Sequence, residues 1–269
     1  LDQRCWRFCF LAFQRCNGWM LDQWTLFLRN AGEWHGSFDT LDRNLQLTKR
    51  QPSILRLEAG PSGVPINLTL LFWPSDPPLE ADPYSGEPAK RIAQSFSSPD
   101  PDLGFFSTGS FSRGTPQVST WSRLYAEFGF LHADRRHRLV LLWDAADRFD
   151  HLVLIREFRA GSSATENPAL SGAQLLGTWQ AQDVSLDRDG SQIEAAPSTS
   201  SLQLQPEHLA GVTWLPDGGG FRVPQRIDQQ QSFTVEALWM ATPQRLEWIQ
   251  RCYGEGGSWL STRHRLLQR

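Results

Sequence analysis

A short Gly-x-Trp signature occurs twice in this chain, as Gly32-Glu33-Trp34 and as Gly177-Thr178-Trp179. Each copy follows a short, partly apolar segment that is predicted to be helical. After the first copy, apolar and polar residues alternate with the period of two that is typical of a half-buried strand. Two openings of this kind in 269 residues, a length sufficient for two small domains, predict two copies of one β-barrel design.

The spacing of the motifs predicts an internal duplication. The two Gly-x-Trp motifs are 145 residues apart, whereas the final hairpins align with an offset of 107, which matches Arg156 with Arg263. The two offsets differ by 38 residues, comparable to the Pro-rich stretch 74–102 of the first half. One duplicated unit with an insertion in its first copy explains both values, and chance similarity between short motifs is the alternative.

These features predict an all-β fold with minor α content, made of two tandem lipocalin-like antiparallel β-barrels, each opened by a short helix. We place the first barrel at residues 20–160 with an insertion at 74–102, a linker at 161–170 and the second barrel at 171–269. Residues 1–19 contain three cysteines and precede Met20. We interpret them as a non-native or disordered extension, with a metal or disulfide role for Cys5 and Cys9 as the alternative.

A Gly-x-Trp on the first strand and an arginine on the last resemble the lipocalin-like closed barrels, in which the arginine lies across the indole and seals one end. A cation over an indole face contributes about 0.5–2 kcal/mol. Counting by twos along its strand places Arg156 on the face of Leu152 and Leu154. We therefore assign barrel closure to six residues: Gly32, Trp34, Arg156, Gly177, Trp179 and Arg263.

The chain also resembles an uncharacterised cyanobacterial family in which an amino-terminal domain of unknown function precedes a second, similar barrel. The resemblance is carried by the stretches 109–114, 127–130, 135–143 and 175–179, and it covers nearly everything from Met20 onward. It implies kinship with a chloroplast biogenesis factor required for ATP synthase, and a fold similar to that of the T-type and S-type chromophore lyases of phycobiliproteins. It also implies a location in the cyanobacterial cytosol, with the thylakoid periphery as a variant.

Composition and motifs exclude several functions. A net charge of −3 does not favour a nucleic-acid partner, and no run reaches the roughly 18 apolar residues of a membrane helix. The six histidines lack metal-site spacing, and no nucleophile elbow or phosphate loop occurs. Cys252 lies in a predicted strand and is interpreted as a packed thiol. We therefore predict no catalytic residue, no metal and no cofactor.

One basic cluster, formed by Arg135, Arg136 and Arg138, lies at a predicted hairpin end. We interpret it as a solvated turn or as a contact for an acidic protein partner. The favoured function is a non-catalytic interaction or assembly factor. The resemblance implies that it assists biogenesis of the catalytic head of ATP synthase, with ATP synthase subunits as partners, or of another photosynthetic-membrane complex. The alternative is a lipocalin-like binding protein for a bilin, another tetrapyrrole or a lipid. A lyase-like role ranks last because no required nucleophile is found.

Overall fold

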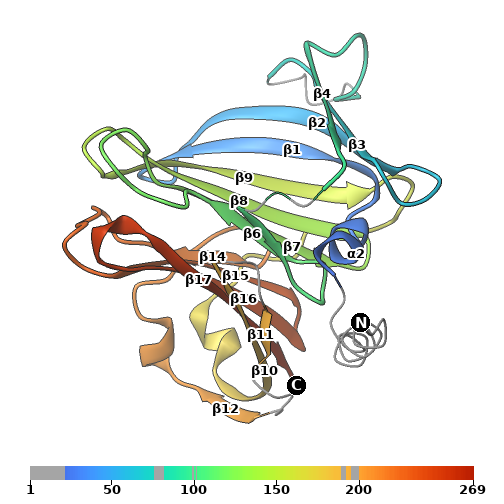
Figure 1. Ribbon diagram of the computed structural model, residues 1–269. Helices are drawn as coiled ribbons and strands as arrows, with labels where there is room; N and C mark the ends of the chain where they lie inside the picture. The colour runs from blue at the N-terminus through green and yellow to red at the C-terminus, as the bar shows by residue number, and fades with distance from the viewer. Residues whose placement is uncertain (1–21, 76–81, 99, 101, 189–191, 195–199) are drawn as a thin grey trace, which may run out of the picture.

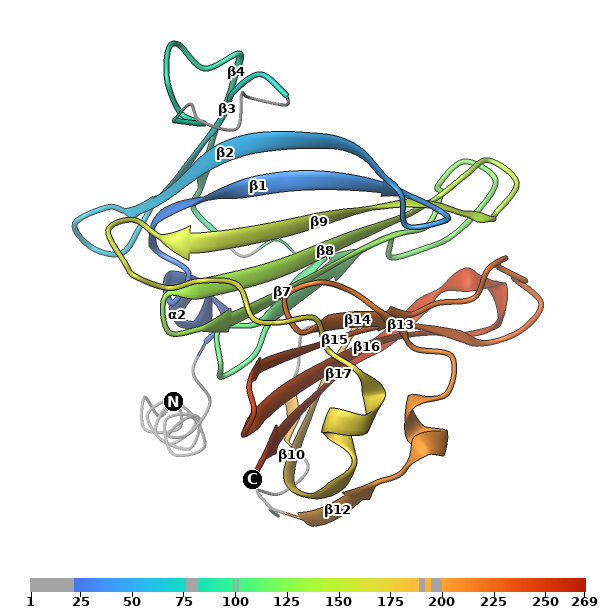
Figure 2. The same ribbon diagram turned by 180° about the vertical axis from the view of Figure 1, so that it is seen from behind.

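A computed structural model of the chain describes residues 22–75, 82–98, 100, 102–188, 192–194 and 200–269. It consists almost entirely of two antiparallel sheets, one curled over the other (Figures 1 and 2). The predicted all-β class is therefore confirmed. The predicted extension 1–19, with Cys5 and Cys9, lies outside the described residues.

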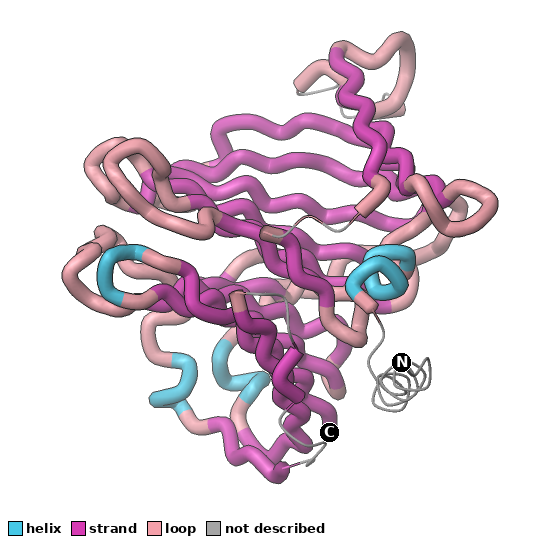
Figure 3. The backbone as a smooth tube through the Cα atoms, viewed as in Figure 1, coloured by secondary structure: helices cyan, strands magenta, loops and turns pink. Residues whose placement is uncertain are grey.

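The first sheet is a curled half-barrel of nine strands in the order β4-β3-β2-β1-β9-β8-β7-β6-β5. A short helix, α2, opens it (cyan in Figure 3). This helix lies near β5. Phe27 of this helix packs on Phe96 of one edge strand and on Phe105 of the other, with ring centroids 5.9 and 5.0 Å apart. Thus α2 bridges the two edges that leave the sheet open. The opening helix and the nine strands of this sheet are α2 (Gln23–Leu28), β1 (Gly32–Asp42), β2 (Leu47–Ala59), β3 (Ile66–Phe72), β4 (Lys90–Phe96), β5 (Leu103–Phe105), β6 (Phe111–Gly114), β7 (Tyr125–His132), β8 (Arg135–Trp143) and β9 (Phe149–Arg159).

The second sheet has eight strands in the order β11-β10-β17-β16-β15-β14-β13, with β12 also paired to β10. A 3₁₀ turn, η1, takes the place of the opening helix. The bounds are η1 (Gly172–Leu175), β10 (Gly177–Asp187), β11 (Gln192–Glu194), β12 (Ser200–Leu204), η2 (Pro206–Leu209), β13 (Thr213–Trp214), β14 (Gly219–Arg222), β15 (Phe233–Thr242), β16 (Arg245–Tyr253), η3 (Glu255–Gly257) and β17 (Trp259–Gln268).

The structure corrects one detail of the sequence prediction and explains another. The stretch 74–102, predicted mainly as an insertion between strands, contains β4, which pairs with β3 from Ile66↔Phe96 to Phe72↔Lys90. The two glycines of the Gly-x-Trp motifs have positive φ values of 132° at Gly32 and 115° at Gly177, a conformation that glycine adopts without steric cost. Each glycine therefore sets the turn from the opening helix into the first strand.

The main hydrophobic core lies between the two sheets. It joins Phe128 and Leu154 of the first sheet to Phe221, Trp239 and other buried residues of the second. Each sheet therefore buries one face on the other and keeps a second, separate face on its own concave side, which is called its lumen below. Because strands β7, β8 and β9 are covered on both faces, buried residues occur on both of their faces, such as Arg136 and His137 on β8.

The hydrogen bonds between the sheets are reciprocal. Phe149 N donates to Gln225 O at 2.9 Å, and Trp259 N donates to Pro116 O at 2.9 Å. A second pair follows the same rule: Ile227 N donates to Asp147 O at 2.8 Å, and Val118 N to Gly257 O at 2.9 Å. Such exchange of equivalent contacts is the pattern of an isologous interface between two copies of one unit.

The reciprocal pairs define a structural equivalence between the sheets. The β8–β9 hairpin corresponds to the β16–β17 hairpin with an offset of 110 (149 to 259, 147 to 257), and the segment preceding β7 corresponds to that preceding β15 with an offset of 109 (116 to 225, 118 to 227). Both hairpins also have a register shift at the same place, Leu142/Trp143 and Cys252/Tyr253. The offset of 107 expected for the hairpins is therefore wrong by three residues, while the duplication itself stays a prediction.

Candidate functional site

The closure of the first sheet is built around Trp34. Its indole Nε1 donates to Asn30 O at 2.9 Å, which ties the first strand to the end of α2. The guanidinium of Arg159 lies over the ring, 4.3 Å from its centroid, and Arg159 is the residue directly opposite Trp34 in the β1–β9 register. Trp34 is fully buried but the Arg159 side chain is 36% exposed, so the stack contributes within the ordinary cation–π range of about 0.5–2 kcal/mol.

The closure of the second sheet repeats this geometry. Trp179 Nε1 donates to Leu175 O at 2.8 Å, and Arg269 lies 4.0 Å from the ring centroid. Arg269 follows Gln268, which pairs with Gln180, so it occupies the place opposite Trp179. Arg159 and Arg269 also obey the offset of 110 found for the hairpins. The closing residues are therefore equivalent in the two halves.

The arginines chosen from the sequence are not the ones on the indoles. Arg156 shares a face with Leu152 and Leu154 as expected, but that face packs toward the second sheet, where Arg156 forms ion pairs with Asp39 and Glu166. Arg263 is exposed on β17. Because both faces of β9 are buried, alternation alone could not tell which face holds the tryptophan.

The basic cluster expected at the surface is buried. One face of strand β8 packs on the second sheet, and there Arg135 bonds Asp217; the other face lines the first lumen, into which Arg136 and Arg138 point. The side chains of Arg135, Arg136 and Arg138 are only 12%, 4% and 14% exposed. These three residues are therefore unable to form the proposed exposed contact for a partner.

Buried polar groups join the two sheets. Glu247 of β16 is fully buried and accepts hydrogen bonds from Ser110 at 2.6 Å and Thr108 at 2.9 Å of the first half, and it lies 2.9 Å from His264 Nε2. Burial would raise the pKa of this carboxyl, but the bonds with His264 and Ser110 and the charge of Arg245 outweigh it and lower the pKa to about 2. Glu247 is therefore ionised and acts as a structural tie.

The first lumen contains a cavity of about 130 Å³ with two unlike walls. One wall is apolar and includes Leu55, Leu57, Leu68, Leu70 and Phe96 from β2, β3 and β4. The opposite wall, on β6, β7 and β8, carries charged side chains: Arg113, Glu127, Arg136 and Arg138, with Asp100 beside them. This cavity was not predicted from the sequence, because its charged residues have the pattern of a solvated turn.

The charged wall is incompletely bonded. Arg138 bonds Glu127 at 2.6 Å, and Arg113 bonds Asp100 at 3.0 Å. Arg136 instead lies 3.4 Å from the buried Glu157, and neither its Nε nor its Nη1 has a hydrogen-bond partner among the described residues. Burial lowers the pKa of Arg136 to about 10. A buried cation in this state is an anchor for an anionic or hydrogen-bonding group.

The second lumen is packed with side chains. Its core contains Trp179, Leu204, Leu246, Trp248 and Leu267, all of them buried. Trp248 Nε1 donates to Glu236 at 2.9 Å, and Glu236 is paired with Arg222 at 2.8 Å. The tryptophans thus fill the space that the first lumen leaves open.

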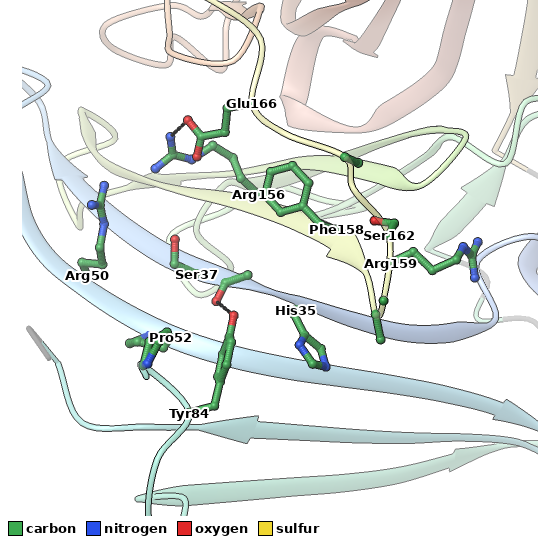
Figure 4. Close-up of a pocket in the computed structure, with 15 residues that line it drawn as sticks. His35, Ser37, Arg50, Pro52, Tyr84, Arg156, Phe158, Arg159, Ser162 and Glu166 are labelled. Carbon is green, nitrogen blue, oxygen red and sulfur yellow. Dashed lines mark hydrogen bonds and ion pairs between the residues drawn. The ribbon is translucent and has the colours of Figure 1, made fainter. Parts of the chain in front are cut away.

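A shallow groove of about 540 Å³ lies on the outer side of β1, β2 and β9 (Figure 4). Tyr84 forms one side: its hydroxyl donates to Gly36 O at 3.3 Å and its ring packs on His35 at 5.2 Å. Residues 160–166 form the other side, where Glu166 meets Arg156 (Figure 4). Its three arginines are paired with acids, Arg50 and Arg156 with Asp39 and Glu166, and Arg159 with Asp134, so the net charge of this groove is small.

A fully exposed tryptophan was not identified from the sequence. Trp121, in the loop between β6 and β7, is 95% exposed, and Leu260 at the start of β17 is 53% exposed. The bonds of Val118 and Pro116 to Gly257 and Trp259 hold the two loops together at one end of the molecule (left in Figure 1). Such apolar exposure marks a candidate interaction surface.

The remaining candidate groups have no evident chemistry. Burial raises the pKa of the Cys252 thiol, so this cysteine is not activated as a nucleophile. Among the described residues, no group of three or more His, Cys, Asp or Glu side chains is placed to hold a metal ion. Within the same residues, none of the helices has the length and apolarity required to cross a bilayer.

Comparison with known proteins identifies two matching regions. The family model described as "Domain of unknown function (DUF3598), N-terminal" matches residues 20–162, which is more than half of the chain. The model described as "Biogenesis factor required for ATP synthase 1, C-terminal domain" matches residues 194–266. No curated protein matches the chain.

Solved structures include one close relative. A protein of unknown function of the DUF3598 family from Nostoc punctiforme is 27% identical, with 93% of this chain and 100% of that chain covered and a TM-score of 0.77. The S-type phycobiliprotein lyase of Guillardia theta is 9% identical over 90% of this chain and 89% of its own, but its TM-score of 0.19 is too low to carry an argument. The chain belongs to the DUF3598 family.

Proposed function

We propose that this protein is a non-catalytic assembly factor that assists biogenesis of the catalytic head of the ATP synthase. The observation that carries the proposal is the match of residues 194–266 to the C-terminal domain of a biogenesis factor required for ATP synthase. This region contains β12 to β16 and most of β17, and thus the greater part of the second sheet.

The surface that we assign to the partner is the loop end with Trp121 and Leu260. Tryptophan is enriched among the residues that dominate binding energy at interfaces. A side chain that is 95% exposed contributes little to the stability of the fold. The stability of the isolated chain therefore does not explain a tryptophan at position 121. Leu260 lies within the matched region 194–266, which places this surface beside the part of the chain that supports the proposal.

The experiment is affinity capture from a cyanobacterial lysate with the full chain as bait, followed by immunodetection of ATP synthase subunits. We expect recovery of these subunits, and a loss of roughly tenfold or more with Trp121→Ser, since a central aromatic anchor is worth about 2 kcal/mol or more. Val64→Ser is the matched control, because Val64 is 40% exposed in the distant loop between β2 and β3. An eluate without ATP synthase subunits would overturn the proposal.

The second candidate function is a lipocalin-like binding protein for a bilin, another tetrapyrrole or a lipid. It is favoured by one observation, the cavity in the first lumen between an apolar and a charged wall. The two functions are compatible, because the cavity and the loop surface lie on different parts of the molecule.

A further inference from the structure

We infer that the first lumen binds a small amphipathic carboxylic acid, with its carboxylate on Arg136 and its apolar chain against β2, β3 and β4. The inference rests on the second candidate function, whose ligand class it names, and is independent of the proposed assembly role. It is defined by the cavity of about 130 Å³ and by the side chains on its two walls.

The charge of the ligand follows from the pairing of the wall. Of the described residues that line the cavity, three are arginines and two are acids. Both acids are already bonded to an arginine, Asp100 to Arg113 and Glu127 to Arg138. Arg136 is left facing the cavity without a hydrogen-bonded acid, and it is 96% buried. Arg136 is therefore the arginine of this wall whose donors lack an acceptor among the described residues, and a carboxylate supplies one.

Glu157 is not the hydrogen-bond acceptor that Arg136 lacks. Its carboxylate lies 3.4 Å from Arg136 and 3.5 Å from Arg138, and neither of its oxygens has a hydrogen-bond partner among the described residues. Its side chain is 0% exposed and it does not line the cavity, so it stands behind the arginines. Glu157 balances the charge of the arginines when the cavity holds no ligand, while the donors Nε and Nη1 of Arg136 have no hydrogen-bond acceptor among the described residues.

The second sheet shows that the barrel design does not require these charges. With the offset of 110, Arg136, Arg138 and Glu157 correspond to Leu246, Trp248 and Leu267, which pack into a core. Arg136 pairs with Glu157 across β8 and β9 just as Leu246 pairs with Leu267 across β16 and β17. A buried ion pair is often no better for stability than leucines at the same place, so a charged pair at this position in the first lumen, where the second has two leucines, points to binding.

The apolar wall defines the rest of the ligand. Leu55 and Leu57 of β2 and Leu68 and Leu70 of β3 present branched side chains, and Phe96 adds an aromatic face near Phe27 of α2. Apolar surface of this kind favours methylene groups, at about 0.8 kcal/mol for each one buried. The cavity is smaller than the roughly 300–1,000 Å³ of most small-molecule sites, so the ligand is a short- or medium-chain monocarboxylate.

The test is calorimetric titration of the full chain with sodium decanoate and, as the uncharged probe, with decan-1-ol. We expect decanoate to bind at least tenfold more tightly than decanol, because a charge-assisted bond to Arg136 is lost in the alcohol. The double variant Arg136→Leu/Glu157→Leu should abolish this preference, since it gives the first lumen the leucine pair of the second and leaves the Arg138–Glu127 pair in place.

Leu246→Met is the matched control, because it changes the equivalent position of the packed lumen conservatively, and it should keep the full preference for decanoate. Thermal unfolding of each variant establishes that it is folded. The inference is overturned if the native chain binds neither probe, if it binds both equally, or if the double variant retains the preference. None of these results depends on whether ATP synthase subunits are captured.

Discussion

The two lumens of this protein differ although their frames are equivalent. Both sheets close with a tryptophan under an arginine, at 4.3 Å in the first and 4.0 Å in the second. Inside that frame, the second lumen is packed by leucine and tryptophan, whereas the first holds a cavity beside Arg136, Arg138 and Glu157. Both sheets therefore have the closing pair, whereas the charges at the positions of Arg136, Arg138 and Glu157 occur in the first sheet alone.

Comparison of the two lumens also indicates that the charged residues around Glu157 make the first sheet less stable than leucines would. Desolvating a charged pair costs several kcal/mol per ion, and its attraction repays this only with good geometry and additional bonds. The distances of 3.4 and 3.5 Å around Glu157 exceed those of a charge-assisted hydrogen bond. Residues that weaken a core and persist beside a cavity are typical of a binding site.

The largest expected effect comes from moving the charge into the packed lumen. Leu246→Arg places a guanidinium among Trp179, Leu204 and Leu267 with no acid at the position equivalent to Glu157. We expect a loss of more than about 4 kcal/mol, because an unpaired buried charge is among the most destabilising changes. Urea unfolding measures it, with Leu246→Met as the control at less than about 1.5 kcal/mol. A small loss for the arginine would show that the second lumen is as adaptable as the first.

Removing the acid from the first lumen should cost slightly less. Glu157→Leu leaves Arg136 and Arg138 without the carboxylate between them, and we expect a loss of about 3–5 kcal/mol in the free energy of unfolding. Glu166→Leu is the control, since its carboxylate is 45% exposed and its loss should cost about 1 kcal/mol or less. Equal effects of the two substitutions would contradict the view that Glu157 is a buried counterion.

The junction between the sheets should respond to acid through Glu247. The pKa of this carboxyl falls from its ordinary 4.5 to about 2 on folding, so its contribution to stability is complete above pH 4.5 and is lost as the pH falls toward 2. The loss amounts to about 3 kcal/mol. Urea unfolding at pH 5 and at pH 3 should therefore show a steeper decline for the native chain than for Glu247→Gln. Parallel declines would refute the role of Glu247.

The smallest expected effects concern closure, where the two halves should behave alike. Arg159→Met and Arg269→Met each remove a guanidinium from an indole and should cost about 0.5–2 kcal/mol. Arg263→Met, at the exposed position first assigned to closure from the sequence, should stay within about 0.5 kcal/mol of the native chain. If Arg263→Met lowered the free energy of unfolding as much as Arg269→Met, Arg263 would have to be reinstated as a closing residue.

Much of this architecture could be predicted from the sequence because its signals are local. Trp34 and Trp179 follow glycines that need positive φ, and alternation along the first strand marks Trp34 as buried. The choice of arginine was wrong because it rested on aligning Arg156 with Arg263. The structure aligns the hairpins on their register shifts at Trp143 and Tyr253, three residues away.

The candidate site could not be predicted, because it depends on what covers each strand. Arg136 and Arg138 have the composition of a solvated turn, and only the packing of the second sheet on one face of β8 and of the lumen on the other shows that both faces are buried. The strand β4 was hidden by the prolines and acids around it. Arg136 stands out as a candidate ligand contact only when it is compared with Leu246, the equivalent residue of the second sheet. That equivalence can be recognised only from the strand registers of both sheets.

The most direct test of the central claim is the free energy of unfolding of Arg136→Leu/Glu157→Leu, measured in urea beside the native chain. If the charged pair serves binding and not folding, the leucine pair that already packs the second lumen should leave the protein at least as stable, with a gain of up to about 4 kcal/mol. A loss of more than about 2 kcal/mol would contradict the account, because it would mean that the first lumen needs its charges to fold.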